Sequence, residues 1–200
     1  MKKWTGCVLA VLLLLSAWMI LPVHGEAGIY DNVIRLHVIA NSDSDEDQAL
    51  KLKVRDAILQ GTTDVLDGAT DREQAEALLC AAIPDIERIA RETLAACGNN
   101  DPVCVTLDKE SYPRRTYEAG ALPAGEYLSL RVQIGEAGGE NWWCVLFPPL
   151  CLSAASADRE AVCLGAGLTE EQYRLITDGS GVQYKLRFKI LEVAEELFDT

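Results

Sequence analysis

The stretch from Gly139 to Cys151, Gly-Glu-Asn-Trp-Trp-Cys-Val-Leu-Phe-Pro-Pro-Leu-Cys, limits most strongly what this chain can fold into. Its aromatic and β-branched residues favour a strand, and the Pro-Pro pair ends that strand because proline cannot donate to a sheet. A second strand is predicted from Tyr127 to Gly135, and the glycines between the two suit a turn. The sequence therefore predicts a β-hairpin over residues 127–147 whose apolar face anchors the core.

The N-terminus has the pattern of a secretory signal. Lys2 and Lys3 precede a charge-free run over residues 4–21, and small residues place the predicted cleavage after Gly25 or Ala27. An uncleaved anchor is the alternative, because a run of about eighteen residues is near the lower limit for spanning a bilayer. In both cases we expect export across the cytoplasmic membrane, with membrane contact only through this segment.

The charge of the chain excludes two classes of partner. There are 31 acidic and 18 basic residues, and the net charge is −13. Such an acidic chain is a poor candidate for binding nucleic acid or anionic lipid. Residues 29–200 suit one domain with its own core, in which residues 152–180 form a loop-rich, variable segment.

Hydrophobic periodicity predicts an α+β domain, with an antiparallel or mixed sheet of about four to five strands and helices packed on one face. Ser44 is the expected N-cap of the first helix. Gly61 and Pro84 are expected to end helices. The predicted helices cover residues 45–60, 72–82, 84–97, 170–177 and 191–198. Besides the hairpin, the predicted strands cover residues 32–40, 103–107 and 182–190, with a short edge strand around Thr116. Residues 151–169 are expected to be a loop.

Six cysteines follow the predicted leader, an even number that permits disulfides in an exported domain. Cys144 and Cys151 flank the Pro-Pro bend and form the predicted bridge. Cys97 and Cys104 flank a turn and form a second reasonable pair. Six cysteines allow several connectivities, and buried free thiols remain the alternative, above all for Cys80 and Cys163.

No catalytic or cofactor motif stands out. The acidic run 43–47 resembles the start of a calcium loop but lacks the required glycine and glutamate at Gln48 and Val54. Zinc spacing is absent, so we expect no metal and no cofactor. The alternative to a binding protein is an exported hydrolase that uses His37 with Cys144 or with a carboxylate.

Six residues are candidates for partner binding. Arg35, His37, Asn41 and Asp43 gather at the end of the first strand, where they form a binding edge or cap the strand and the next helix; capping is favoured. Trp142 and Trp143 point to opposite sides of their strand, so one should face the core. The other is covered by residues 151–169 or contacts a partner.

Several segments closely resemble the stage II sporulation protein R family. They are Ile34–Ser42, Glu46–Gln48, Leu50–Asp56, Pro123–Tyr127, Leu130–Val132, Ile134–Glu136 and, most distinctively, Asn141–Cys151. The resemblance spans about residues 30–151 and fades over residues 152–180.

The resemblance implies a signalling protein of endospore-forming bacteria that is made in the forespore and exported into the space between forespore and mother cell. There, proteins of this family activate a membrane-embedded aspartic protease, stage II sporulation protein GA. That protease cleaves the precursor of the mother-cell sigma-E factor. The resemblance implies no catalytic residues for this chain.

Overall fold

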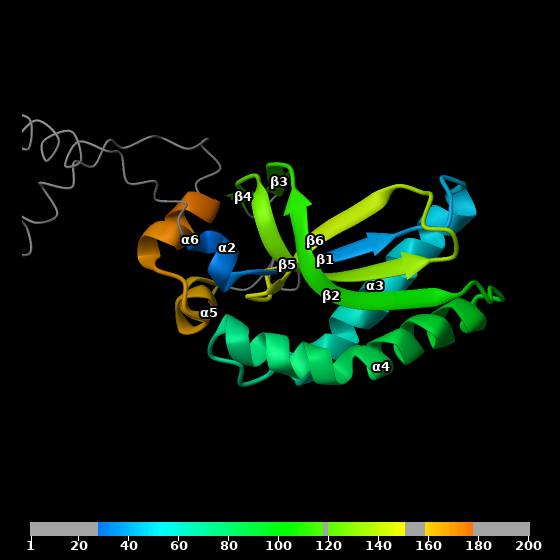
Figure 1. Cartoon of the computed structure of the whole chain (residues 1–200), viewed down its shortest axis with the longest axis horizontal. Coiled ribbons are helices and arrows are strands. Elements are labelled where there is room, and N and C mark those ends of the chain that lie inside the picture. Colours follow the sequence, from blue (N-terminus) through cyan, green and yellow to red (C-terminus); the bar gives the residue numbers. More distant parts are fainter. Residues whose placement is uncertain (1–27, 118–119, 151–158, 178–200) are drawn as a thin grey trace, which may run out of the picture. The chain divides into compact units, whose positions relative to one another are not determined.

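The main sheet has four strands, and its strand nearest the N-terminus lies between two strands from the second half of the chain (Figure 1). The computed structural model of the protein describes residues 28–117, 120–150 and 159–177. The sheet order is β2 (Val103–Tyr112), β5 (Gly125–Ile134), β1 (Ile34–Ile39) and β6 (Asn141–Phe147). β1 is parallel to β5 and antiparallel to β6, while β2 is antiparallel to β5. The predicted α+β class with a mixed sheet is confirmed.

The predicted hairpin over residues 127–147 is wrong. Both of its strands form, but β1 is inserted between β5 and β6 and pairs with each of them. Adjacent strands are about 4.8 Å apart, so the segment after β5 must cross about 10 Å to reach β6. Backbone hydrogen bonds from its glycines hold this segment at the end of β1. The N–H of Gly138 donates to the carbonyl of Asn41 at 3.1 Å, and the N–H of Gly139 donates to the carbonyl of Ala40 at 3.0 Å.

Two long helices, α3 (Asp45–Leu66) and α4 (Arg72–Ala96), cover one face of the sheet, as predicted (Figure 1). Ser44 begins α3 as expected, and its hydroxyl accepts the N–H of Asp47 at 3.2 Å. The strands and both helices share one apolar core, whose buried members include Ile34, Leu36, Val38, Leu50, Val54, Ile58, Leu79, Ile86, Leu94, Leu130 and Val132.

The first helix does not end at Gly61, because this glycine lies inside α3 at its contact with α4. A Cβ atom on residue 61 would lie 2.6 Å from Cδ1 of Ile89 in α4. The glycine therefore permits close packing of the two helices, a tertiary role that its sequence neighbourhood does not reveal.

The predicted break at Pro84 is also wrong, since α4 continues through it. Proline removes one helical hydrogen bond, but Pro84 is exposed, so its ring does not disturb the core. Buried residues on both sides, such as Leu79, Ala82 and Ile86, hold the two halves of the helix on the same core. Gly98 ends α4 as expected, with a positive φ of 79°.

Smaller elements gather at the end of the sheet where β1 begins. They are α2 (Ile29–Asn32), β3 (Arg115–Tyr117), β4 (Gly120–Leu122), α5 (Arg159–Gly165) and α6 (Glu170–Thr177). β3 and α6 confirm two predicted elements. α5 corrects the prediction that residues 151–169 are a loop: buried Cys163 fixes this short helix on a second apolar cluster. That cluster also contains Ile29, Val33, Tyr112, Leu122, Tyr127, Val145, Leu168 and Ile176.

Several predictions fall outside the described residues. These are the signal segment over residues 1–25, Cys151, the strand over residues 182–190 and the helix over residues 191–198. Within the described ranges, no helix has both the length and the apolar character needed to cross a membrane.

Candidate functional site

The candidate site is the face of the main sheet opposite α3 and α4, which we call the polar face. Four side chains form one row across its strands, because paired residues share a side of the sheet. Thr106 of β2 pairs with Arg131 of β5, Arg131 with His37 of β1, and His37 with Trp143 of β6. β3 adds Arg115, which stacks on Trp143, and Tyr117, which accepts a hydrogen bond from Arg35.

Arg35 of β1 is fully buried on the polar face, among tyrosine rings. Its guanidinium carbon lies 4.1 Å from the ring centre of Tyr112 and 5.1 Å from that of Tyr127. Its Nε donates to the carbonyl of Cys144 at 3.1 Å, and its Nη2 donates to the hydroxyl of Tyr117. Aromatic faces stabilise such a desolvated cation.

Neither Tyr112 nor Tyr117 balances this buried charge as a tyrosinate. Burial raises the pKa of Tyr112 well above its ordinary value, despite the hydrogen bond with Ser129. Burial likewise raises the pKa of Tyr117, against the opposing charges of Arg35 and Arg115. Both rings are therefore neutral at physiological pH, and Arg35 keeps a net positive charge inside the polar face.

His37 contacts an acidic residue that sequence reasoning did not single out. Its Nδ1 lies 2.9 Å from Oε1 of Glu110, and its Nε2 lies 2.7 Å from Oδ1 of Asn141. Burial acts to raise the pKa of Glu110. The charge of His37 and the hydrogen bonds from His37, Ser129 and Tyr112 outweigh burial and lower the pKa below its ordinary value. Glu110 is thus held as a carboxylate.

The two tryptophans lie on opposite sides of β6, as predicted. Trp143 is half-buried on the polar face, with its ring centre 5.4 Å from that of His37 and 3.9 Å from the guanidinium carbon of Arg115. Trp142 is 37% exposed on the other side, where Arg55 of α3 stacks over it at 4.3 Å. Trp143 alone therefore joins Arg35 and His37.

Asn41 and Asp43 do not join that group, because they hold the segment that crosses from β5 to β6. Oδ1 of Asn41 accepts the N–H of Glu136 at 3.0 Å, and Oδ1 of Asp43 accepts the N–H of Glu140 at 2.7 Å. Gly135 has a φ of 57°, and a Cβ there would lie 2.2 Å from Oδ1 of Asn41. Asn41 and Asp43 therefore join the end of β1 to the segment between β5 and β6.

Cys144 and His37 lie on opposite faces of the sheet. Cys144 pairs with Leu36 and belongs to the core beneath α3 and α4, whereas His37 pairs with Trp143. The geometry therefore does not assemble the nucleophile pair considered from the sequence. Cys144 is not a free thiol, and its predicted partner Cys151 lies outside the described residues, so that bridge stays a prediction. Cys80, Cys97 and Cys104 are exposed free thiols.

The acidic run after β1 has a structural explanation. Hydrogen bonds from Ser42 and Asn41 lower the pKa of Asp47 below its ordinary value, against a smaller effect of burial. Asp47 thereby ties the end of β1 to the first turn of α3. In the part of the chain that the structure describes, no group of three His, Cys, Asp or Glu side chains could hold a metal ion.

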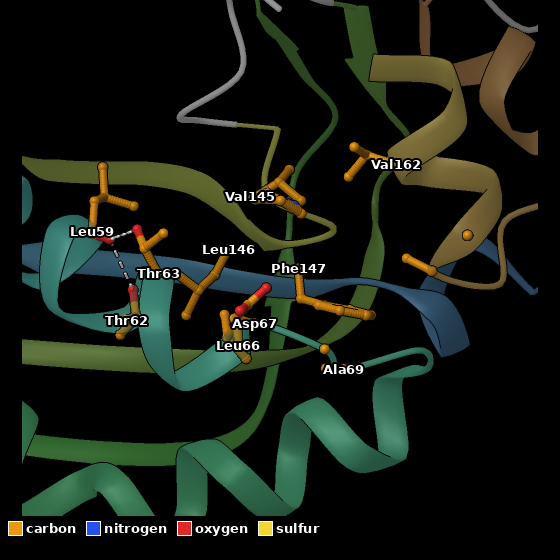
Figure 2. A pocket seen from close by; sticks show the side chains of 14 residues that line it. Leu59, Thr62, Thr63, Leu66, Asp67, Ala69, Val145, Leu146, Phe147 and Val162 are labelled. Atoms are coloured by element: carbon orange, nitrogen blue, oxygen red, sulfur yellow. Dashed lines mark hydrogen bonds between the residues drawn. The ribbon is translucent and has the colours of Figure 1, made fainter. Parts of the chain in front are cut away.

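An apolar cavity of about 270 Å³ lies between the end of α3, β6 and α5 (Figure 2). Its polar hydroxyls are already bonded: Thr62 donates to the carbonyl of Ile58 at 2.8 Å, and Thr63 to that of Leu59 at 2.9 Å. The side chains facing it, including Leu66 and Phe147, are mostly apolar. Asp67 is the charged residue that lines this otherwise mostly apolar cavity. The polar face, with several charged and aromatic side chains in contact, is the stronger candidate.

Sequence reasoning missed the residues that reach Arg35 and His37 from β2, β3 and β5. Glu110 and Tyr112 lie beyond Leu107, where the predicted strand stopped, but β2 continues to Tyr112. The signal that could have found them is the alternation that places Thr106, Asp108, Glu110 and Tyr112 on one side of an extended strand.

Comparison with known proteins gives one family. A family model described as stage II sporulation protein R matches residues 30–157. A curated protein of Bacillus subtilis (strain 168), named stage II sporulation protein R, is 39% identical over 160 residues; the match covers 76% of this chain and 71% of that protein. No solved structure matches.

Proposed function

The chain belongs to the stage II sporulation protein R family, and on this premise we propose that it acts in endospore formation as an exported signalling protein. In this role it binds and activates the membrane-embedded aspartic protease stage II sporulation protein GA. The activated protease then cleaves the precursor of sigma-E. The chain itself is a protein ligand rather than a catalyst.

The family match over residues 30–157 is the observation that carries this proposal. That range contains all four strands of the main sheet and therefore the whole row Thr106, Arg131, His37 and Trp143. An activating ligand must bind the active state of its receptor more tightly than the inactive state. A partly exposed face with charged and aromatic groups is suited to such selective binding.

The N-terminal pattern supports the proposed location between forespore and mother cell. Two lysines precede a charge-free run over residues 4–21, as in a secretory signal. A protein that reaches that space meets the outer side of a membrane-embedded receptor. Fractionation of sporulating cells tests this location; recovery of the chain solely from forespore cytoplasm would contradict it.

Reconstitution is the direct test of the proposed activity. The full chain, the protease in proteoliposomes and the sigma-E precursor are combined, and precursor cleavage is followed by gel electrophoresis. We expect cleavage to rise when the chain is present on the receptor's outer side. Equal cleavage with and without the chain would rule out the activating role.

The two tryptophans allow a matched comparison within that assay. Trp143 lies on the polar face and Trp142 on the opposite side, so Trp143→Ala should reduce activation more than Trp142→Ala. Thermal unfolding confirms that each variant is folded, and Trp143→Phe tests whether an aromatic ring restores activity. Equal activation by Trp143→Ala and the unmodified chain would exclude a contact role for Trp143.

A hydrolase that uses His37 with a carboxylate is the second candidate, and the His37–Glu110 contact is the observation that favours it. A washout experiment separates the two candidates. The protease is incubated with the chain, the chain is removed, and precursor cleavage is measured again. Reversal on removal indicates a ligand, whereas activation that persists indicates a covalent change made by a hydrolase. Full activation by a folded His37→Asn variant would also eliminate the hydrolase.

A further inference from the structure

Eight arginines in the described part of the chain fall into two groups. Those of α3, α4 and α6 each form an ion pair with a carboxylate; they are Arg55, Arg72, Arg88, Arg91 and Arg174. The polar face carries Arg35, Arg115 and Arg131, and within the described ranges none of the three pairs with a carboxylate. The same face carries the carboxylates of Asp108 and Glu110, so its three arginines still outnumber its acids, on a chain whose net charge is −13.

The same three arginines have unused hydrogen-bond donors. Five buried side-chain atoms in the described part of the chain lack a hydrogen-bond partner, and four of them lie on the polar face. They are Nη1 of Arg35, Nε of Arg115, Nε of Arg131 and Oγ1 of Thr106. A buried donor without an acceptor destabilises the free protein, and these arginines have no acceptor for these atoms among the described residues.

These donors differ in how far a partner can reach them. Arg115 and Arg131 are half-buried, whereas Arg35 is fully buried and bonded to Tyr117 of β3. A partner can therefore contact the parts of Arg115 and Arg131 that are exposed, although their Nε atoms are buried, while Arg35 contributes only its positive charge from within the fold. The guanidinium carbon of Arg115 lies 3.9 Å from the ring centre of Trp143, and a stacked guanidinium keeps its N–H donors in its own plane, where they can bind a carboxylate.

We propose that the polar face binds an extended, acidic segment of a partner protein, with Arg115 and Arg131 each receiving a carboxylate and Trp143 packing against an apolar side chain between them. Arg131 and Trp143 lie in one row with one strand between their own, so about 10 Å separates their backbones. An extended segment spans that distance in about three residues. This inference rests on the proposed function only for the identity of the partner.

Charge favours an acidic protein segment over a polyanion. At physiological ionic strength, charges interact over about 8 Å, so a short segment senses mainly the local arginines. A nucleic acid or an anionic membrane extends further and meets the acidic remainder of the chain, which repels it. The planar fork of an arginine also matches a carboxylate in two parallel hydrogen bonds.

Two synthetic peptides test the proposal on the full chain in a non-ionic detergent. The acidic probe is acetyl-Ser-Asp-Ser-Phe-Ser-Asp-Ser-amide, in which both acids and the phenylalanine share one side of an extended chain, and its control replaces each acid by the corresponding amide. Binding is measured by calorimetry and by the NMR shift of the Trp143 indole N–H. We expect the acidic peptide to bind at least about tenfold more tightly, a difference of about 1.4 kcal/mol. Its affinity should fall as salt is added.

Matched variants assign the binding to this face. Arg115→Gln combined with Arg131→Gln should abolish the preference for the acidic peptide. Arg88→Gln combined with Arg91→Gln changes the net charge equally on exposed parts of α4 and should preserve it. Circular dichroism melts confirm that both double variants are folded.

Three results would overturn the proposal. One is equal binding of the two peptides; another is an acidic preference that survives the Arg115/Arg131 changes. The third is binding to phosphatidylglycerol vesicles that these changes abolish while the peptides do not bind, which assigns the face to a membrane. The reconstitution assay remains separate: a chain that binds the acidic peptide but does not activate the protease contradicts the proposed function and leaves this inference standing.

Discussion

His37 and Glu110 touch across a strand that lies between their own. His37 is in β1 and Glu110 in β2, β5 separates the two strands, and yet Nδ1 and Oε1 are 2.9 Å apart. Ser129 of β5 lies under this contact and is small enough to leave room for it; its hydroxyl bonds Tyr112 at 2.6 Å. The contact therefore ties three strands of the polar face together.

Glu110→Gln should make the stability of the protein less dependent on pH. Because the folded-state pKa of Glu110 is lowered, its stabilising contribution is fully present above the ordinary glutamate pKa and is lost as pH falls through the folded value. We expect the variant to be about 1–2 kcal/mol less stable at pH 7, with the difference shrinking as the pH falls below the ordinary glutamate pKa. Urea unfolding from pH 7 to pH 3 measures this.

Glu126→Gln is the matched control for that prediction. Glu126 is exposed, so the same chemical change should leave the stability and its pH dependence almost unaltered. A constant difference between Glu110→Gln and the unmodified protein from pH 7 to pH 3 would contradict the role assigned to the carboxylate.

Arg35→Lys should destabilise the protein more than Arg35→Met does. A lysine keeps a buried positive charge but loses the planar stacking on Tyr112 and Tyr127. A methionine removes the charge and keeps apolar contact with the rings. We expect about 3 kcal/mol for the lysine variant and a smaller loss for the methionine variant. Guanidinium unfolding measures both, and the reverse order would show that the buried charge is not the dominant cost.

Gly61→Ala should be neutral or slightly destabilising on its own, although alanine is usually about 1 kcal/mol better than glycine inside a helix. The reason is the 2.6 Å approach of the new Cβ to Cδ1 of Ile89. Ile89→Val removes that methyl group, so Gly61→Ala should stabilise the Ile89→Val background. A double-mutant cycle of thermal unfolding measures the coupling; additive effects would exclude the contact.

Cys144 and Cys151 should be the bridged pair. Under denaturing, non-reducing conditions, a thiol reagent should label Cys80, Cys97 and Cys104, which are exposed free thiols in the structure. Cys144 and Cys151 should react only after reduction, as peptide mass spectrometry can show. Labelling of Cys144 without reduction would contradict the bridge.

The sequence predicts the structure wherever the deciding interaction is local. The start of α3 depends on Ser44, which bonds Asp47 three residues later, and the end of α4 depends on the positive φ of Gly98. Gly61 and Pro84 were misjudged because contacts with distant residues override their local preferences. The fold class was therefore predictable, while the ends of two helices were not.

The candidate site was predictable only in part for the same reason. Arg35, His37 and Trp143 lie in segments whose residue pattern predicts strands, so the sequence could identify them as candidate partner-binding residues. Their partners Glu110 and Tyr117 come from β2 and β3, and only the strand order brings them near. The sequence predicted that β5 and β6 pair with each other, which left β1 outside the hairpin. Hydrophobic periodicity alone could not correct this strand order, so it could not indicate which side chains contact each other on the polar face.

The insertion of β1 between β5 and β6 also sets the order in which the chain can fold. β1 leaves the ribosome early, but Ile34 must wait for Leu128 on one side and for Phe147 on the other. The α3–α4 pair is complete before either arrives, and it can offer β1 an apolar surface but no edge to pair with. Until residues up to 147 are available for pairing, β1 is therefore an unpaired, aggregation-prone strand, wherever the chain folds.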